Sequence, residues 1–127
     1  MAPYRYEVQI FYEDTDHSGV VYHANYLKYF ERAREMVIGP QHLARLWSEQ
    51  GLGFAVYKAR IDYLDGAQFG ERLDIRSTVL QQSDYRLVWH QEAWRPAAAR
   101  PAVRAEIHLV CLDRERRLRP IPAWQAD

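Results

Sequence analysis

Residues 12–35 read YEDTDHSGVVYHANYLKYFERARE, a carboxylate-rich stretch that leads directly into a helical pattern. Its polar start has the composition of a loop, in which Gly19 can adopt a positive φ. The residues that follow show the spacing of a helix with one buried face, with apolar side chains at Tyr26, Phe30, Ala33 and Val37. Asn25 is placed to cap the first turn, and Gly39 followed by Pro40 ends the helix. The stretch therefore predicts a long helix that begins directly after a polar loop.

Alternating side chains predict strands on both sides of this helix. The segment from Tyr4 through Tyr12 alternates before it, and a second helical stretch from Gln41 to Gln50 follows it. After Gly53 the period of two returns, with strands expected at 55–63, 72–79, 85–94 and 103–112. The first of these is expected to place on one face Ala55, Tyr57, Ala59, Ile61 and Tyr63. Short connections favour antiparallel pairing, so the chain is predicted to be an α+β domain whose five-stranded antiparallel sheet buries the helix.

Composition limits the class of protein. The 127 residues fit one domain, and Lys+Arg balances Asp+Glu at 17 each, so no net charge attracts nucleic acid or an anionic membrane. No apolar run approaches the roughly 20 residues needed to span a bilayer, and the first ten residues lack the apolar segment of a signal peptide. The single cysteine, Cys111, lies in an apolar run and is interpreted as a buried thiol. We predict one soluble, cytoplasmic domain over residues 1–127, neither an integral membrane protein nor a nucleic-acid-binding one.

The polar loop and the helix start are where chemistry is expected. The chain has no Gly-x-Ser-x-Gly elbow, P-loop, Gly-x-Gly-x-x-Gly, Cys-x-x-Cys or His-Glu-x-x-His motif. Unpaired N–H groups and the positive end of the dipole at a helix start can polarise a carbonyl oxygen. A carboxylate a few residues upstream can attack the carbonyl carbon or deprotonate water. This segment therefore supplies both groups that acyl transfer requires.

The same segment resembles a known family. DTDHSGVVYHANY at residues 14–26, continuing into YFERAR at 29–34, is similar to the signature of the 4-hydroxybenzoyl-CoA thioesterase family of hotdog-fold proteins, and above all to the Tol-Pal-associated acyl-CoA thioesterases. Later landmarks are also similar, namely IDY at 61–63, FGE at 69–71 and VCLD at 110–113. The resemblance implies a hotdog fold, in which the sheet wraps the central helix. It also implies homodimers or homotetramers with active sites at the subunit interface.

The resemblance further implies roles for individual residues. Asp16 takes the position of the catalytic aspartate, as nucleophile or general base, and the backbone N–H of His23 takes that of the donor to the thioester oxygen. Tyr22, Asn25 and Gly19 are implied to shape the substrate pocket. The chain would then hydrolyse an acyl-CoA thioester to a free acid and coenzyme A, without a metal or other cofactor.

Other interpretations of these residues remain open. By residue type alone a metal site is conceivable from Asp14, Asp16, His17 and His23, although loop spacing is weak support for one. His17 replaces the small residue of most relatives, and either changes the polarity of the pocket or lies in solvent. Glu31 is a secondary catalytic candidate, but an ion pair with Arg34 is its first interpretation. His90 and His108 are interpreted as ordinary sheet residues.

The function also has an alternative, and the contacts to coenzyme A are unassigned. The phosphates of coenzyme A require basic side chains, for which the candidates are Lys58, Arg60, Arg86, Arg114, Arg116, Arg117 and Arg119. A solvated turn is the favoured interpretation of the last four. The alternative function is a non-hydrolytic hotdog domain that binds acyl-CoA, acyl carrier protein or a protein partner, because one fold supports binding and hydrolysis. The sequence leaves open the acyl group, the carrier of the thioester, and dimer versus tetramer.

Overall fold

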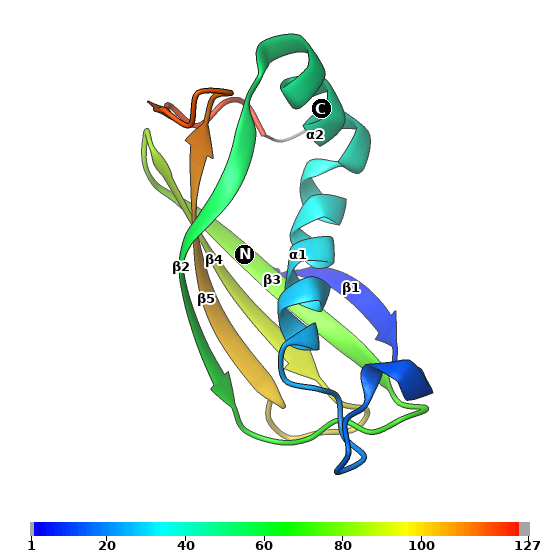
Figure 1. Cartoon of the computed structure of the whole chain (residues 1–127). Coiled ribbons are helices and arrows are strands. Elements are labelled where there is room, and N and C mark those ends of the chain that lie inside the picture. Colours follow the sequence, from blue (N-terminus) through cyan, green and yellow to red (C-terminus); the bar gives the residue numbers. More distant parts are fainter. Residues whose placement is uncertain (1, 125–127) are drawn as a thin grey trace.

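The computed structural model describes residues 2–124 and shows one curved antiparallel sheet with a long helix across one face (Figure 1). The strands are β1 (Tyr4–Gln9), β2 (Gly53–Tyr63), β3 (Arg72–Ser83), β4 (Arg86–Trp94) and β5 (Val103–Leu112). They lie in the order β1-β3-β4-β5-β2, and each neighbouring pair is antiparallel. The helix is α1 (Asn25–Ile38), and a short strand β6 (Leu118–Arg119) pairs with β5. The predicted α+β architecture is confirmed, with β6 as an addition.

The core lies between α1 and the inner face of the sheet. Alternate residues of the central strands are buried there: Leu73, Ile75, Leu87, Trp89, Val103, Ala105 and Ile107. From α1 the side chains of Tyr26, Phe30 and Ala33 pack onto them, as the helical spacing predicts. Burying a large apolar side chain contributes about 1.5–3 kcal/mol, so this layer fixes the position of α1 and of the loop that precedes it.

The strand β1 is shorter than predicted, because local hydrogen bonds end it. A 3₁₀ turn, η1 (Tyr12–Asp14), stands where the alternation predicts more strand. The carboxylate of Asp14 accepts the N–H of Phe11 at 2.8 Å, and the hydroxyl of Thr15 donates to the carbonyl of Tyr12 at 2.6 Å. Such bonds between side chain and backbone compete with a strand ladder. The prediction that the strand continues through Tyr12 is wrong, and this side chain is 77% exposed.

A β-bulge at Tyr57 changes the face that β2 presents. Val56 pairs with Leu109 but Lys58 pairs with His108, so Tyr57 is an extra residue. The inner-face positions are consequently Phe54 and Val56 before the bulge and Ala59, Ile61 and Tyr63 after it. The prediction that Ala55 and Tyr57 lie on this face is wrong, because an inserted residue reverses the alternation.

The C-terminal end of α1 agrees with the sequence. Gly39 has a φ of 104°, and its N–H donates to the carbonyl of Glu35 at 2.7 Å, which ends the helix. The second helical stretch is present as α2 (Pro40–Arg45) and a π-helical turn, η2 (Leu46–Gln50). Within residues 2–124, no helix has the length and apolar character needed to cross a membrane.

Candidate active site

The loop that carries Asp16 is closed by its own backbone. The N–H of Asp16 donates to the carbonyl of Val20 at 2.8 Å, and the N–H of Gly19 donates to the carbonyl of Asp16 at 3.1 Å. Gly19 has a φ of 87°, which a residue with a side chain rarely adopts. Gly19 therefore determines the shape of the loop.

The carboxylate of Asp16 is oriented by Ser18. Its Oδ1 accepts the Ser18 N–H at 2.8 Å and the Ser18 hydroxyl at 2.7 Å. The hydroxyl and then the amide of Ser18 lower the pKa of Asp16, and the nearby His23 adds to this effect. Asp16 is therefore ionised near neutral pH. Both bonds from Ser18 end on Oδ1 and not on Oδ2.

The connection between β2 and β3, residues 65–71, supports the Asp16 loop. Val20 forms a β-bridge with Gln68. Gly66 lies so close to Val20 that an added Cβ would meet Val20 Cγ1 at 2.7 Å. The position of Asp16 therefore depends on this connection as well as on its own turn.

Arg95, just after β4, holds the connection in place. Its guanidinium is bidentate on Glu71, with both bonds at 3.0 Å, and pairs with Asp65 at 2.8 Å. Bidentate pairs of this kind are among the strongest side-chain hydrogen bonds. Between the two acids, the carbonyl of Ala67 accepts the N–H of Val21 at 2.8 Å. This bond joins the clamped connection to the Asp16 loop.

His23 lies at the start of α1 and has an unused backbone N–H. The N-cap residue is Ala24, which offers no side-chain cap. The carbonyl of His23 is occupied, because it accepts the Tyr63 hydroxyl at 3.1 Å and the Tyr26 N–H at 3.4 Å. The N–H of His23 has no acceptor among residues 2–124. An unpaired amide at the positive end of a helix can stabilise an oxyanion.

Tyr22 and Asn25 flank this amide in different ways. The Tyr22 side chain is exposed, and its ring centroid lies 4.5 Å from that of His23. Asn25 Nδ2 instead donates to the carbonyl of Asp14 at 3.0 Å. The prediction that Asn25 caps the helix is wrong, because Asn25 is already helical and its amide ties the helix to the preceding loop. His23 thus lies against Tyr22 and acts electrostatically on Asp16, whereas the Asn25 side chain bonds to the backbone of the preceding loop.

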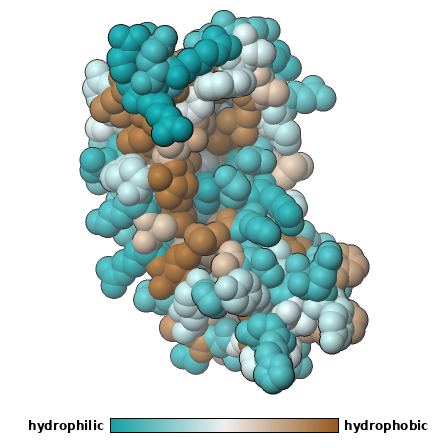
Figure 2. All heavy atoms as spheres, viewed as in Figure 1, coloured by the Kyte–Doolittle hydropathy of each residue, from teal (hydrophilic) through white to brown (hydrophobic). Residues whose placement is uncertain are grey.

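A groove between α1 and β2 begins one turn after the helix start, and we call it the α1–β2 groove. It consists of two adjoining hollows of about 310 Å³ each, both lined by Glu31, Arg34 and Val56. The rest of its apolar lining comprises Leu27, Ile38, Leu43, Trp47, Leu52, Phe54, Ala59, Ile107 and Leu109, and Lys28 lines the first hollow as well. Figure 2 shows apolar side chains gathered in a hollowed band between α1 and β2. The sequence analysis missed this groove, because it forms between segments that are distant along the chain.

Arg34 does not form the predicted ion pair with Glu31. The Arg34 side chain is 6% exposed, and its Nη1 donates to Gln91 Oε1 at 3.0 Å. Burial lowers the pKa of Arg34. The charges of Glu31 and Glu35 partly offset this lowering, although neither carboxylate pairs with the guanidinium. The prediction rested on helical spacing, which cannot register a polar partner on the sheet. Glu31 is exposed and lines the groove, so it stays a secondary catalytic candidate.

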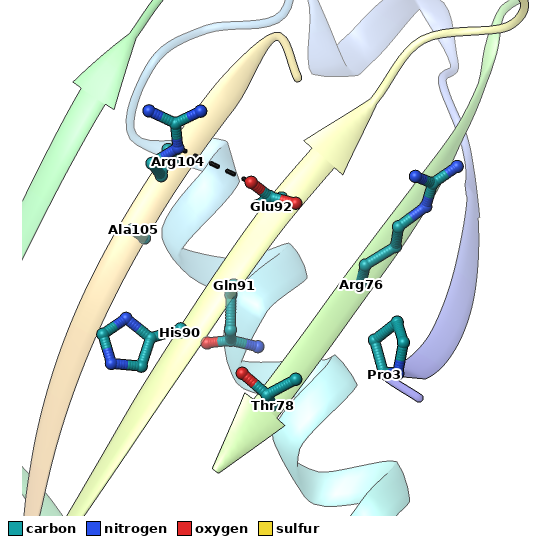
Figure 3. Close-up of a pocket in the computed structure, with 8 residues that line it drawn as sticks. All are labelled: Pro3, Arg76, Thr78, His90, Gln91, Glu92, Arg104 and Ala105. Carbon is teal, nitrogen blue, oxygen red and sulfur yellow. Dashed lines mark ion pairs between the residues drawn. The ribbon is translucent and has the colours of Figure 1, made fainter. Parts of the chain in front are cut away.

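A hollow on the other face of the sheet lies away from these groups (Figure 3). Its volume is about 400 Å³, and its lining includes Arg76, His90 and Arg104. Arg104 pairs across the strands with Glu92 at 3.5 Å, and His90 is exposed beside them. No residue of the Asp16 loop or of α1 lines this hollow. We therefore do not assign it to the candidate site.

The arginines near the C-terminus hold a turn. Arg117 and Arg119 pair with Asp113 at 3.5 and 3.7 Å, and Arg114 donates to the carbonyl of Trp47 at 2.7 Å. These bonds support the interpretation of this group as a surface turn. The other basic candidates are exposed on β2 and β4, namely Lys58, Arg60 and Arg86.

The structure also locates the residues considered for a metal site and the single cysteine. Across the described range, no group of three His, Cys, Asp or Glu side chains is arranged to hold a metal ion. His17 is exposed. Cys111 is a free, buried thiol, and burial raises its pKa.

Relatives of known class match nearly the whole chain. The family model described as Thioesterase-like superfamily matches residues 12–127. The acyl-CoA thioester hydrolase YbgC of Escherichia coli O157:H7 is 33% identical over 112 residues, which cover 87% of this chain and 82% of that protein. The 1,4-dihydroxy-2-naphthoyl-CoA hydrolase of Synechocystis is 32% identical over 129 residues, which cover 98% of this chain and 94% of that protein.

Solved structures share the fold. Slr0204, a 1,4-dihydroxy-2-naphthoyl-CoA thioesterase from Synechocystis, superposes with a TM-score of 0.85 at 31% identity, covering 94% of this chain and 90% of that one. A probable thioesterase from Bartonella henselae superposes with a TM-score of 0.87 at 27% identity, covering 95% and 100%. The resemblance seen in the sequence is thereby confirmed, and the chain belongs to the thioesterase-like superfamily of hotdog-fold proteins.

Proposed function

We propose that this thioesterase hydrolyses acyl-CoA to a free acid and coenzyme A, with Asp16 as the nucleophile or the general base. Several relatives about 33% identical over most of the chain are named acyl-CoA thioester hydrolases. The observation that carries the proposal is the combination of an ionised Asp16 carboxylate with the unused N–H of His23 at the helix start. A thioester needs one group to attack or to activate water, and another to stabilise the oxyanion.

Two routes use these groups. In both, the thioester oxygen accepts the N–H of His23, and the dipole of α1 favours the developing negative charge. In the nucleophilic route, Asp16 Oδ2 attacks the carbonyl carbon, the thiolate of coenzyme A leaves and is protonated by water, and water then cleaves the mixed anhydride. In the base route, Asp16 takes a proton from the water that attacks the carbonyl carbon, and coenzyme A leaves as the thiol.

The α1–β2 groove is the proposed site of the acyl group. Its first hollow is lined by Leu27, which lies one helical turn from the His23 amide, and its walls are mainly apolar. Tyr22 is exposed beside the same amide and stays a proposed substrate contact. For Gly19 and Asn25 we propose indirect roles in binding, through the shape of the loop and its attachment to the helix.

Replacement of Asp16 tests this function. Asp16→Asn keeps an oxygen that accepts the two bonds from Ser18, so the loop should retain its shape. We expect thiol release from a panel of acyl-CoA substrates to fall by about 10²–10⁴-fold, the usual contribution of a positioned acid or base. Asp14→Asn is the matched control, because that carboxylate bonds to the backbone of the turn and should leave turnover within a few-fold. Unchanged turnover in Asp16→Asn would remove this residue from the mechanism.

A single turnover in ¹⁸O-labelled water can identify the nucleophilic route, because only that route can place the label in the protein. In the base route the labelled oxygen enters the free acid. In the nucleophilic route, attack of water on the Asp16 side of the anhydride leaves the label in the protein. Saturable binding of acyl-CoA without thiol release, from any member of the panel, would instead favour the non-hydrolytic alternative.

We also propose that the chain forms homodimers through β2. This strand has 11 residues on the edge of the sheet, with Val56 and Tyr63 49% and 46% exposed. A long apolar edge strand is normally paired or covered, and a second copy related by two-fold symmetry would pair the edge and wall the adjacent groove. Val56→Lys should raise the dimer dissociation constant in light scattering, whereas Lys58→Glu on the other face should have a smaller effect.

The cytoplasm, where acyl-CoA is made, stays the predicted location.

A further inference from the structure

The start of α1 is tied to the sheet by a side chain from a distant strand. The N-cap residue, Ala24, makes no side-chain cap bond, so the ordinary restraint of a helix start is missing. The hydroxyl of Tyr63 instead donates to the carbonyl of His23 at 3.1 Å. A bond to this carbonyl restrains the backbone and leaves the N–H of His23 free, which is the group that the proposed mechanism needs.

The direction of the His23 N–H is determined by the peptide unit that it shares with Tyr22. The carbonyl of Tyr22 accepts the N–H of Asn25 at 2.8 Å, so it points into the helix. The peptide bonds of the described residues are all trans, and the C=O and N–H of a trans peptide point in opposite directions. The N–H of His23 consequently points out of the helix, toward the space in front of its first turn.

This peptide unit is held from both sides. On one side, the N–H of Tyr22 donates to the carbonyl of Asp14 at 2.9 Å. On the other side, the carbonyl of His23 has two donors in residues 2–124, and the N–H of Tyr26, at 3.4 Å, lies beyond the usual range of about 2.7–3.2 Å. The hydroxyl of Tyr63 is therefore the stronger partner. Without it, the peptide unit can rotate on the side of His23.

The backbone of Tyr63 is itself firmly anchored. Tyr63 is the last residue of β2, at the end of the sheet where α1 begins (Figure 1). It pairs with Val103 of β5, which is fully buried. The N–H groups of the next two residues, Leu64 and Asp65, both donate to the carbonyl of Ala102, at 2.7 and 3.0 Å. The position of Tyr63 is thus set by the sheet and not by the helix that it contacts.

The ring of Tyr63 is also restrained, and its hydroxyl remains a donor. The ring meets the rings of His23 and Tyr26 edge to face, with centroids 6.0 Å apart in each pair. These two contacts limit the directions in which the hydroxyl can point. Burial raises the pKa of Tyr63, so the hydroxyl keeps its proton near neutral pH.

We propose that Tyr63 is a positioning residue, which holds the His23 amide in the direction that the thioester oxygen requires. This inference rests on the proposed function, in which that amide is the oxyanion donor. Tyr63 acts through the backbone and does not touch the reacting atoms. A catalytic group must lie within about 10–20° of its productive direction, so a peptide unit that loses this tie serves the transition state less well.

Tyr63→Phe tests the proposal because it removes the hydroxyl and keeps the ring. We expect kcat to fall by about 5- to 20-fold, less than the roughly 100- to 1000-fold cost of removing an oxyanion donor outright. KM should change little, because the oxyanion forms only in the transition state. The fall in kcat should be equal for a short and a long acyl-CoA. A loss that grows with chain length would place Tyr63 in the acyl site and overturn the proposal.

Tyr57→Phe is the matched control. Tyr57 lies on the same edge strand and is 44% exposed, against 46% for Tyr63. Its hydroxyl lies 3.2 Å from His108 Nδ1, so the control also loses one hydrogen bond. We expect wild-type kcat from Tyr57→Phe, and the same oligomeric state for both variants in light scattering. An equal fall of kcat in both would assign the effect to the strand and overturn the role of Tyr63.

Residual dipolar couplings of the free protein separate this inference from the proposed function. They report the direction of each backbone N–H, so Tyr63→Phe should change the coupling of His23 and leave those of residues 30–37 in α1 unchanged. If Tyr63→Phe does not fold, as judged by circular dichroism, Tyr63→Met removes the hydroxyl in its place. An unchanged His23 coupling in the folded variant overturns the inference even if acyl-CoA is hydrolysed. A changed coupling supports the tie even if the wild-type chain hydrolyses no acyl-CoA, in which case the proposed function alone fails.

Discussion

Gly66→Ala should displace the Asp16 loop without touching the catalytic groups. The added Cβ would lie 2.7 Å from Val20 Cγ1 and 3.1 Å from Val20 Cβ, whereas ordinary contact begins at 3.4 Å. The valine must therefore move by about 0.7 Å, and its branched side chain cannot rotate away freely. Because the carbonyl of Val20 accepts the N–H of Asp16 at 2.8 Å, the movement is transmitted to the catalytic loop.

The magnitude follows from that displacement. Overpacking of this kind costs about 1–3 kcal/mol of stability, a fraction of the total for a domain of this size. A shift near 1 Å at a reacting group costs up to about 100-fold in rate, so we expect kcat to fall by about 10- to 100-fold. KM should change less, because the α1–β2 groove is built from other segments.

The assay is thiol release with an acyl-CoA substrate, with melting temperatures measured in parallel. Gly53→Ala is the matched control for the melting temperature alone, because its Cβ would meet nothing closer than Trp47 at 3.8 Å but Gly53 lines the α1–β2 groove. The double variant Val20→Ala with Gly66→Ala removes the methyl groups that clash and should recover most of the lost rate. If Gly66→Ala keeps wild-type kcat, or if the double variant recovers nothing, the contact does not position Asp16.

Three further changes probe the loop, its clamp and the core. Ser18→Ala removes the hydroxyl that most lowers the pKa of Asp16, so that pKa rises; because catalysis needs the ionised form, the acid limb of the pH–rate profile should move to higher pH, while an unmoved limb would exclude Asp16 as its origin. Arg95→Gln removes the cation that pairs with Glu71 and Asp65. It should lower kcat more than it raises KM, and it should speed amide exchange at Val21. Normal exchange at Val21 would show that the connection between β2 and β3 keeps its position without Arg95. Phe30→Ala empties a fully buried site and should lower the free energy of unfolding by about 3–5 kcal/mol in urea titrations, whereas a loss below 1 kcal/mol would place this ring outside the core.

The sequence predicts the elements well where one local period governs them. The spacing from Tyr26 to Ala33 identifies the buried face of α1, and the strand at 103–112 has the expected bounds. The sequence also predicts the polar loop before the helix, because the composition of this segment disfavours a helix or a strand. These features depend on neighbours along the chain, which a sequence displays directly.

The features that the sequence does not predict depend on partners far along the chain. Tyr57 is an extra residue only in relation to its partner strand, so the alternation of β2 alone cannot reveal the bulge. Arg34 lies four residues after Phe30 on the buried face of α1, but the polar partner that accommodates its charge there, Gln91, lies on β4. The α1–β2 groove likewise exists only once the helix and the edge strand are brought together.

The contact between the Asp16 loop and the β2–β3 connection bears on how active sites of this family can be exchanged. Gly66 and Val20 occupy complementary positions, and the clamp of Arg95 acts on the connection alone. A chimera that receives only the Asp16 loop of a relative would place that loop against a β2–β3 connection that does not match it in shape. Residues 12–24 and 65–71 should therefore be transplanted together from the same relative, although they lie far apart in the chain.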